Sequence, residues 1–277
     1  MICEICNKRD VHILYDRKAT AAGRDIYQCE HCNLIFTSPH DYVHQLCDDS
    51  QIKNLYLEMS EFREPVLVDN LQQIERIKGK GRILDIGCYI GSFIRLAKQS
   101  GWGCAGLEPS DYVSKYAAET FGITVLPVYL RDANFGNYSF DVVTMFHVLE
   151  HIIHPHVELL EIKRILKPNG LLVIEVPKAS HYLYRLFKGL KICYPPEHYY
   201  YFTPDTIEKL LHKSGFKIVK IVPGKIFVSP YRILWTLSKI VERLCGRRMG
   251  LVNKLKLGRK GILLNSGKNM LVFSQAL

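Results

Sequence analysis

The 277-residue sequence lacks a long uninterrupted apolar run, although 48% of its residues are hydrophobic. A bilayer-spanning helix needs about 20 consecutive apolar residues, so no membrane span is expected. The first residues, MICEIC, have neither the basic stretch nor the apolar core of a secretory signal. Internal repeats and low-complexity tracts are also missing. We therefore expect a cytoplasmic protein with one large α/β domain and a small module.

Acidic residues are nearly missing from the C-terminal part. After Phe216 the sequence has thirteen Lys and Arg residues but one acid, Glu242. That segment carries +12 and residues 1–216 carry −2, so the net charge of +10 belongs to one end of the chain. The basic character therefore belongs to the C-terminal part and not to the whole protein.

The nine cysteines are an odd number, and without an export signal we expect them to be reduced. Four of them form two Cys-x-x-Cys pairs that bracket twenty-two residues: Cys3 with Cys6, and Cys29 with Cys32. Each pair presents two thiolates on one side of a tight turn, which suits tetrahedral zinc. The spacing predicts a zinc ribbon at residues 1–40. The alternatives are unligated buried thiols or a redox dithiol, for which a surrounding βαβ unit is missing.

Residues 41–80 are polar with apolar positions at helical spacing, which predicts a helical linker or cap. Strands and helices then alternate, and this predicts a parallel doubly wound sheet. The expected strands are 82–87, 103–108, 123–128, 140–146, 171–177, 216–222 and 269–277, the last two forming an antiparallel edge. The expected helices are 91–100, 111–121, 156–166 and 204–214.

The stretch GRILDIGCYIGSF, residues 81–93, has the pattern of a strand, a tight turn and a helix start. Gly87 and Gly91 let the backbone approach a ligand, toward which the helix start directs free N–H groups. Tyr89 stands where a middle glycine is usual. Glu108 ends the next strand, where a carboxylate can accept both hydroxyls of a ribose. This combination fits NAD as well as S-adenosylmethionine.

Later motifs separate these two cofactors. The chain contains, in order, LDIGCYIGSF, GLEPS, FDVVTMFHVLEHI, EIKRILKPNGLLVIEVP and PPEHYYYFTPDTIEKLLHKSGF. Over about residues 80–222 it resembles the class I S-adenosylmethionine-dependent methyltransferases. The resemblance implies a Rossmann-like, seven-stranded doubly wound sheet at residues 81–277, preceded by the zinc ribbon. An N-terminal zinc unit with four cysteine ligands also appears in relatives that act on sugars and other small metabolites.

The resemblance also assigns cofactor-binding roles by position. Asp85 would lie beneath the methionine amino group, and Glu108 would hold the ribose. Tyr89 departs from the small residue of the family, so its ring must point away from the cofactor or lie over it. The other residues carried over are Gly87 and Gly91, along the amino-acid part, and Met145 and Phe146, facing the cofactor.

The segment HVLEHIIHPH follows strand 140–146, the natural place for acceptor chemistry. We expect His147, Glu150 and His151, at i, i+3 and i+4, to share one face of a helical turn. Such a face supplies a base for an acceptor hydroxyl or ligands for a divalent metal. It is similar to the metal clusters of small-RNA 2′-O-methyltransferases and ubiquinone-pathway O-methyltransferases, which add a downstream His, here His198. His147 replaces their first acid, which favours zinc over Mg²⁺. Alternatively, Glu150 and His151 only brace the loop.

Two further segments bear on the acceptor. The aromatic residues of one could stack on a sugar or an aromatic acceptor, or fill the core: Tyr194, Tyr199, Tyr200, Tyr201 and Phe202. The other, an insertion at about 224–267, contains an amphipathic helix and the basic run NKLKLGRKG. It could form a lid, lie on an anionic membrane through residues 229–260, or, less favoured, bind nucleic acid.

These patterns predict a cytoplasmic methyltransferase that would be peripheral to the inner membrane face if the insertion binds lipid. Its expected cofactors are S-adenosylmethionine, structural zinc and, if the histidine cluster binds metal, a second divalent ion. The expected acceptor is a hydroxyl of a sugar or glycan intermediate, which could be lipid-linked, or of a small metabolite. The alternatives are an RNA 2′-O-methyltransferase and a non-catalytic zinc-ribbon module with a degenerate cofactor fold.

Overall fold

A computed structural model describes residues 2–18, 20, 23–37, 49–179, 197–245 and 260–277. The larger of its two sheets has seven strands in the order β10-β11-β8-β7-β4-β5-β6. Their bounds are β4 (Arg82–Ile86), β5 (Gly103–Leu107), β6 (Val125–Leu126), β7 (Phe140–Phe146), β8 (Leu166–Pro177), β10 (Phe216–Val228) and β11 (Ile262–Ala276). The pairs among β4 to β8 are parallel, whereas β11 runs antiparallel to β8 and β10. The Rossmann-like sheet and its antiparallel edge are thereby confirmed.

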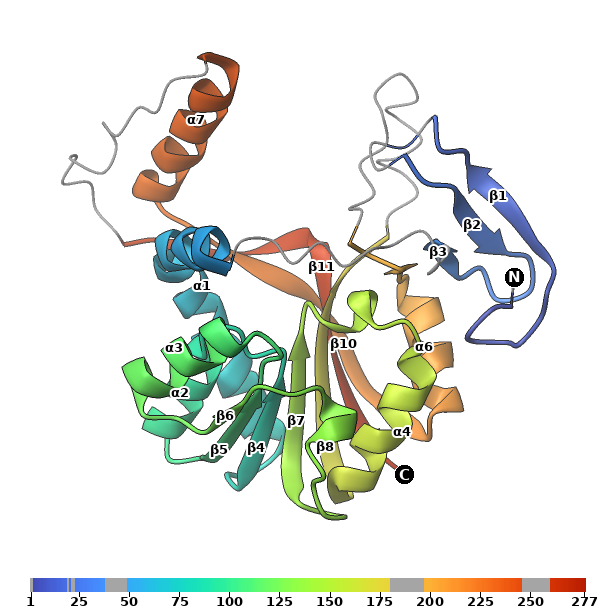
Figure 1. Ribbon diagram of the computed structural model, residues 1–277, viewed down its shortest axis with the longest axis horizontal. Helices are drawn as coiled ribbons and strands as arrows, with labels where there is room; N and C mark the ends of the chain where they lie inside the picture. The colour runs from blue at the N-terminus through green and yellow to red at the C-terminus, as the bar shows by residue number, and fades with distance from the viewer. Residues whose placement is uncertain (1, 19, 21–22, 38–48, 180–196, 246–259) are drawn as a thin grey trace.

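Helices cover both faces of this sheet (Figure 1). On one face lie α1 (Asp49–Ile77), α2 (Ser92–Gln99) and α3 (Asp111–Phe121), and on the other α4 (Pro155–Ile165) and α6 (Pro204–Lys213). Alternate residues of β7 supply the two cores: Val142 packs with α1 and α2, and Val143 with α4 and α6. A sheet buried on both faces explains why its central strands are almost entirely apolar.

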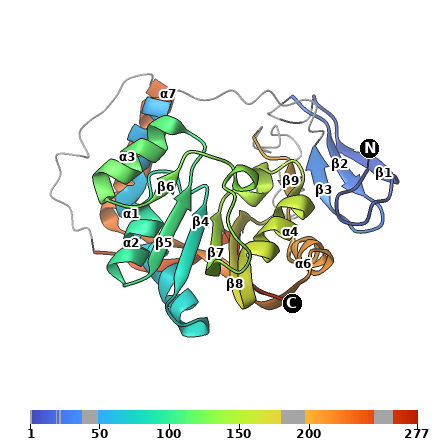
Figure 2. The same cartoon turned by 60° about the horizontal axis from the view of Figure 1, so that its bottom comes forward.

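The smaller sheet contains the predicted ribbon strands and one strand from far along the chain. It comprises β1 (Val11–Tyr15), β2 (Ile26–Cys29), β3 (Ile35–Thr37) and β9 (Tyr200–Tyr201), all antiparallel in that order. Figure 2 shows β9 beside β3. Leu34 and Phe36 belong to the same apolar core as Leu159 of α4 and Ile207 of α6. The ribbon is therefore joined to the large domain by both a sheet and a core.

The insertion contains α7 (Pro230–Cys245), which begins beside α1, where the Tyr231 and Phe62 rings lie 5.8 Å apart (Figure 1). Three apolar side chains on it are exposed: Ile233 by 51%, Leu234 by 38% and Leu237 by 51%. The expected lid, with this face packed on the acceptor pocket, is wrong for these residues. Among the described helices, none combines the length and apolar character that crossing a membrane requires. Residues 246–259, with most of the basic run, lie outside the described residues.

Candidate active site

The loop between β4 and α2 depends on two glycines at the carboxyl edge of the sheet. Gly87 has φ 67° and Gly91, the residue that precedes α2, has φ 74°. A Cβ atom on Gly87 would lie 2.5 Å from Val148 Cγ2, and one on Gly91 would lie 2.5 Å from Ile123 Cδ1. Both the left-handed backbone and the close packing therefore require glycine. The backbone N–H groups at the start of α2 lie at this turn, and such groups suit an anionic or polar ligand.

Asp85 lies at the end of β4 and is only 3% exposed. Its Oδ1 accepts a hydrogen bond from Thr144 Oγ1 of β7 at 2.6 Å. Burial raises the pKa of Asp85 to about 7, despite this hydrogen bond. A cation placed beside the carboxyl group would restore its charge. Thr144 was not singled out from the sequence, because a threonine inside an apolar strand carries no specific signal.

Glu108 faces the same loop from β5. Its two oxygens accept hydrogen bonds from the backbone N–H groups of Tyr89, at 3.0 Å, and Ser110, at 3.1 Å. Tyr89 itself has φ 51°. The two loops that follow neighbouring strands are thus tied together through Glu108, whose contact with a cofactor ribose stays a prediction.

Met145 and Phe146 end β7 with less access to this edge than the resemblance implied. Met145 is completely buried in the core, and Phe146 packs edge-on against Phe93 with ring centroids 4.9 Å apart. Contact between either residue and the cofactor stays a prediction.

His147 turns the chain at the end of β7. Its φ of 59° is left-handed, and the residues after it form a 3-10 helix, η3 (Leu149–His151). The prediction that His147, Glu150 and His151 share one face of a helical turn is therefore wrong, because the strand ends in a sharp turn first. Instead, the His147 ring lies between two buried acids: Nδ1 is 3.4 Å from Glu150 Oε1 and Nε2 is 3.7 Å from Glu175 Oε1.

Electrostatics keep His147 charged. Burial disfavours the imidazolium, but Glu150 and Glu175 outweigh it and raise the pKa of His147 to about 9. One third of the side chain is exposed, which moderates these interactions without reversing their direction. In turn, His147 outweighs the burial of Glu175 and lowers the pKa of that acid. Because both ring nitrogens face carboxylates, His147 is suited to orient Glu150 rather than to accept a proton.

Glu150, His151 and His198 form the second half of the expected cluster. A possible ligand atom from each lies within 4.8 Å of the other two. Glu150 is 1% exposed, and neither of its oxygens has the geometry of a hydrogen bond to any described residue. The His151 and His198 rings are perpendicular, with centroids 4.7 Å apart. The charged His147 ring compensates the Glu150 carboxylate from one side, and its oxygens can still accept a hydrogen bond from an acceptor hydroxyl or bind a metal ion.

The hydrogen bonds and burial of the two histidines determine which of their ring nitrogens carry a proton beside this carboxylate. His151 Nδ1 lies 2.8 Å from the Glu197 carbonyl oxygen, an acceptor, so that nitrogen carries the proton and Nε2 keeps a lone pair. Burial lowers the pKa of His198 to about 4, so its ring is neutral at pH 7. The cluster therefore offers lone pairs on both rings beside an acid.

Sequence reasoning missed two residues of this site, Glu175 and Asn269. Asn269 Nδ2 lies 3.1 Å from Glu175 Oε1, to which it donates, and 3.3 Å from His147 Nε2. Glu175 could have been found, since it is the one acid inside the apolar strand LLVIEVP. Asn269 gave no such signal, because only the β11–β8 pairing brings it to the site.

The aromatic segment is core in its described part. Tyr199, Tyr200, Tyr201 and Phe202 are each at most 6% exposed. The Tyr200 hydroxyl donates to the Ile153 carbonyl and the Tyr201 hydroxyl to that of His198. The expectation that these rings stack on an acceptor sugar is wrong, because their faces are already packed. Tyr194 lies outside the described residues.

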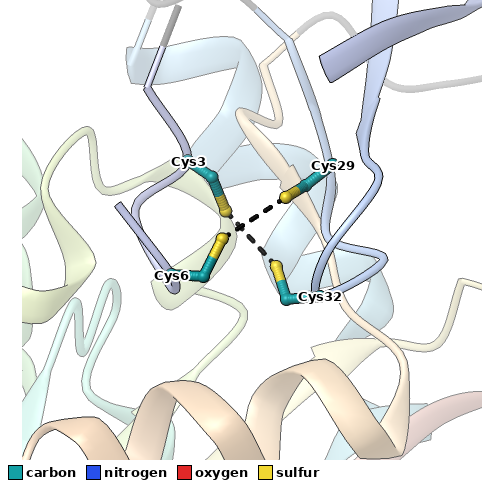
Figure 3. A group of neighbouring side chains, drawn as sticks. All are labelled: Cys3, Cys6, Cys29 and Cys32. Atoms are coloured by element: carbon teal, nitrogen blue, oxygen red, sulfur yellow. Dashed lines mark hydrogen bonds between the residues drawn. The ribbon is translucent and has the colours of Figure 1, made fainter. Parts of the chain in front are cut away.

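The four predicted zinc ligands meet at one point (Figure 3). Cys3 Sγ lies 3.3 Å from Cys32 Sγ, and Cys6 Sγ lies 3.4 Å from Cys29 Sγ. Zinc–sulfur bonds of about 2.3 Å in a tetrahedron place the sulfurs about 3.8 Å apart, so a small expansion would admit the ion. Burial raises the pKa of Cys3 to about 11, whereas backbone N–H groups of Cys32 and His31 outweigh burial and lower the pKa of Cys29 to about 7.

Comparison with known proteins identifies the fold and its chemistry. A family model described as a methyltransferase domain matches residues 59–221. The chain belongs to this methyltransferase family. The methyltransferase is 30% identical over 186 residues to the ubiquinone biosynthesis O-methyltransferase of Roseobacter denitrificans, covering 61% of this chain and 72% of that protein. It is 29% identical over 155 residues to the tRNA U34 carboxymethyltransferase of Cellvibrio japonicus, covering 50% of this chain and 46% of that protein.

A solved structure shows the same fold. It is the S-adenosylmethionine-dependent methyltransferase of Thermotoga maritima, with a TM-score of 0.54 and 18% identity, over 82% of this chain and 96% of that one. The family match and this fold show that the chain is an enzyme that uses S-adenosylmethionine, as the sequence motifs implied.

Proposed function

We propose that this methyltransferase transfers the methyl group of S-adenosylmethionine to a hydroxyl group of a small molecule. The observation that carries the proposal is the buried cluster of Glu150, His151 and His198. The methyl donor is already activated as a sulfonium, but a hydroxyl acceptor must also lose a proton. Lone pairs on two histidines beside a buried carboxylate are suited to take that proton.

The cofactor would bind at the opposite part of the same sheet edge. Asp85 would pair with the amino group of the methionine part, and Glu108 would accept the ribose hydroxyls beside its present backbone donors, since each carboxylate oxygen can accept two hydrogen bonds. The backbone at Gly87, Tyr89 and Gly91 would line the amino-acid part. These roles follow from the family positions and are consistent with the buried carboxyl group of Asp85 and the glycine-dependent loop.

In the reaction, the acceptor oxygen attacks the methyl carbon as the carbon–sulfur bond breaks, leaving S-adenosylhomocysteine. The hydroxyl proton moves to Nε2 of His151, the ring nitrogen left with a lone pair when Nδ1 donates to the Glu197 carbonyl. Glu150 stabilises the resulting imidazolium, and His147 holds Glu150 in place from the other side. Positioning of the acceptor oxygen in line with the methyl group and the sulfur supplies the rest of the rate enhancement.

Metal ions have two candidate sites. The four cysteines suit a structural zinc ion. Glu150, His151 and His198 would supply a carboxylate and two imidazoles to a second divalent ion, a donor set that suits zinc more than Mg²⁺. A metal bound there would lower the pKa of the acceptor hydroxyl.

Two observations bear on the acceptor. The ubiquinone biosynthesis O-methyltransferase relatives support a small molecule, whereas the packed tyrosines no longer support a sugar or glycan. The exposed apolar residues of α7, followed by a sequence of basic residues, support contact with an anionic membrane through residues 229–260. A lipid-linked acceptor would agree with both.

The test uses methyl-labelled S-adenosylmethionine, purified protein and lysate from a strain that lacks the gene. Products are separated into lipid, polysaccharide, RNA, protein and small-molecule pools. We expect label in the lipid or small-molecule pool. Label confined to RNA or polysaccharide would overturn the small-molecule acceptor, and RNA label would favour 2′-O-methylation. An isothermal titration with S-adenosylhomocysteine runs beside it, because absent binding would instead point to a degenerate cofactor fold.

A further inference from the structure

The backbone of Tyr199 connects the cysteine-bearing sheet to the proposed catalytic cluster. Its N–H donates to the Glu150 carbonyl at 2.8 Å, and its carbonyl accepts from the Thr37 N–H at 2.9 Å. Thr37 ends β3, whereas Glu150 belongs to η3. His198 is the preceding residue, so one peptide segment holds both a ribbon contact and a member of the cluster.

Strand pairing extends this connection to the cysteines. Beyond Tyr199, residues of β9 pair with β3 through Phe36–Tyr200 and Ile35–Tyr201. The strand β3 pairs in turn with β2, which ends at Cys29. The Cys29 N–H donates to the Leu34 carbonyl at 2.9 Å, closing the turn that carries the second cysteine pair. Any change in this turn is therefore transmitted to β9 through two ladders of hydrogen bonds.

The first cysteine pair is held to the large domain on the same side. Lys213 Nζ, at the end of α6, donates to the Glu4 carbonyl at 2.8 Å and to Asn7 Oδ1 at 3.0 Å. His154 Nδ1 lies 3.2 Å from Glu4 Oε1, three residues beyond His151. Both cysteine pairs thus have contacts that lead to the segments flanking the cluster.

Metal binding by the four cysteines would hold the two cysteine turns, and with them their contacts to the large domain, in one fixed arrangement. The sulfurs of the two knuckles, separated by twenty-two residues, meet through two weak S–H···S contacts of 3.3 and 3.4 Å, whereas an ion would join them by four metal–sulfur bonds. Without the ion, opening of the turn at Cys29 is opposed by these thiol contacts and by backbone hydrogen bonds, such as that from the Asn33 N–H to the Cys29 carbonyl. The small sheet is short, with only two residues in β9, so it depends on this constraint.

We propose that a zinc ion on Cys3, Cys6, Cys29 and Cys32 positions the acceptor side of the active site, through Tyr199 as the positioning residue for His198 and Glu150. The ribbon then forms part of the acceptor side of the active site. Its zinc content controls kcat and leaves the affinity for the cofactor unchanged. The catalytic consequence rests on the proposed function of the cluster, but the structural coupling does not.

Amide hydrogen exchange of the full chain tests the coupling directly. Zinc is first quantified in the purified protein, with one ion per chain expected, and is then removed with a chelator under reducing conditions. We expect exchange of the Tyr199 amide to accelerate at least tenfold on removal. The Cys88 amide, which donates to Leu107 on the cofactor side, serves as the internal control and should change less than twofold. Absent zinc, or unchanged exchange at Tyr199 after its loss, overturns the proposal.

A matched pair of variants then tests the specific hydrogen bond. Thr37→Pro removes the N–H that donates to Tyr199, whereas Thr37→Ala keeps it and loses only the hydroxyl bond to the Asp25 carbonyl. We expect Thr37→Pro to retain zinc and S-adenosylhomocysteine affinity but to accelerate Tyr199 exchange and lower kcat at least tenfold relative to Thr37→Ala. Equal exchange in the two variants overturns the link. If Thr37→Pro fails to fold, as shown by lost ligand binding, the wild-type zinc experiment decides alone.

The outcomes also separate this proposal from the proposed function. If zinc removal accelerates exchange of the Tyr199 amide but no pool receives a methyl group, the proposed function is contradicted and the structural coupling stands. Methyl transfer that survives zinc loss would keep the function and overturn the control of turnover by the ribbon.

Discussion

The cofactor side and the acceptor side of the active site are assembled in different ways. Residues 85–108 supply the proposed cofactor contacts from two neighbouring strands and the loops directly after them. The acceptor side takes its residues from four distant segments: β3, the end of β7 with η3, β8 and residues 197–201, with Asn269 of β11 behind them. A locally built site is stiffened by its own turn, whereas an assembled one depends on tertiary contacts.

The difference predicts which kinetic quantity each side controls. Changes on the cofactor side should act on ligand affinity, and changes on the acceptor side should act on turnover at saturating cofactor. Substitutions that mix the two effects would show that the sides are not independent. The experiments below test this separation, beginning with the largest expected change.

The variants His198→Ala and His151→Ala should give the largest effect. Loss of a positioned base lowers turnover by about 10²- to 10⁴-fold, and we expect both kcat values to fall within that range. S-adenosylhomocysteine affinity, measured by calorimetry, should stay within twofold of wild type. His212→Ala, on the exposed surface of α6, is the control. Normal turnover in both variants would reduce the cluster to a structural brace.

Asp85 should make cofactor affinity depend on pH. Its pKa is raised from the usual 3.8 to about 7 by burial, and only its carboxylate attracts the amino group of the cofactor. The Kd for S-adenosylhomocysteine should therefore fall by up to about tenfold per pH unit as the pH rises toward 7. The ligand-free protein should lose stability as the pH rises from about 4 to about 7. Over this range the folded state keeps the Asp85 proton, whereas the unfolded state has already released it.

Calorimetry and thermal melting between pH 5.5 and 8 would measure both effects. Asp85→Asn should flatten the affinity profile and weaken binding at pH 8 by at least tenfold. A flat profile in the wild type would show that Asp85 does not face the amino group. The turnover of the acceptor side should follow a separate pH dependence if the two sides are independent.

These contrasts also explain what the sequence could and could not reveal. The sheet and the cofactor loop were predictable, since β4, Gly87, Gly91 and Glu108 follow one another at a spacing that local geometry imposes. The cysteine cluster was predictable for the same reason, because each knuckle is local. In contrast, the burial of Tyr199–Phe202 follows from the pairing of β9 with β3, and the place of Asn269 from the pairing of β11 with β8. Pairings between distant segments leave no fixed spacing in the sequence.

The turn at His147 illustrates the same point on a smaller scale. The spacing of His147, Glu150 and His151 is that of a helix, but the residue after a buried strand must first change the chain direction. His147 does so in a left-handed conformation, which an isolated histidine seldom adopts. Its ring is held there by Glu150 and Glu175, one of them from another strand.

Gly87→Ala should weaken cofactor binding by about tenfold. A left-handed alanine costs about 1 kcal/mol, and its Cβ would also lie 2.5 Å from Val148 Cγ2, which displaces the loop. Gly101→Ala is the matched control, because Gly101 also has positive φ, at 89°, but no atom within 4 Å of the added Cβ. Both variants should lose stability in chemical denaturation, and only Gly87→Ala should lose affinity. Equal affinity in both would show that the loop tolerates displacement.

Tyr89→Gly should give the smallest effect and is the sharpest test of the cofactor loop. Tyr89 adopts φ 51°, so glycine relieves about 1 kcal/mol of backbone strain while its N–H still donates to Glu108. If the cofactor is held by the backbone alone, affinity for S-adenosylhomocysteine should change less than threefold. A loss above tenfold would mean that the ring lies over the cofactor and contributes to binding. Tyr89→Phe, which keeps the ring and removes the hydroxyl, would then show which part of the side chain makes that contact.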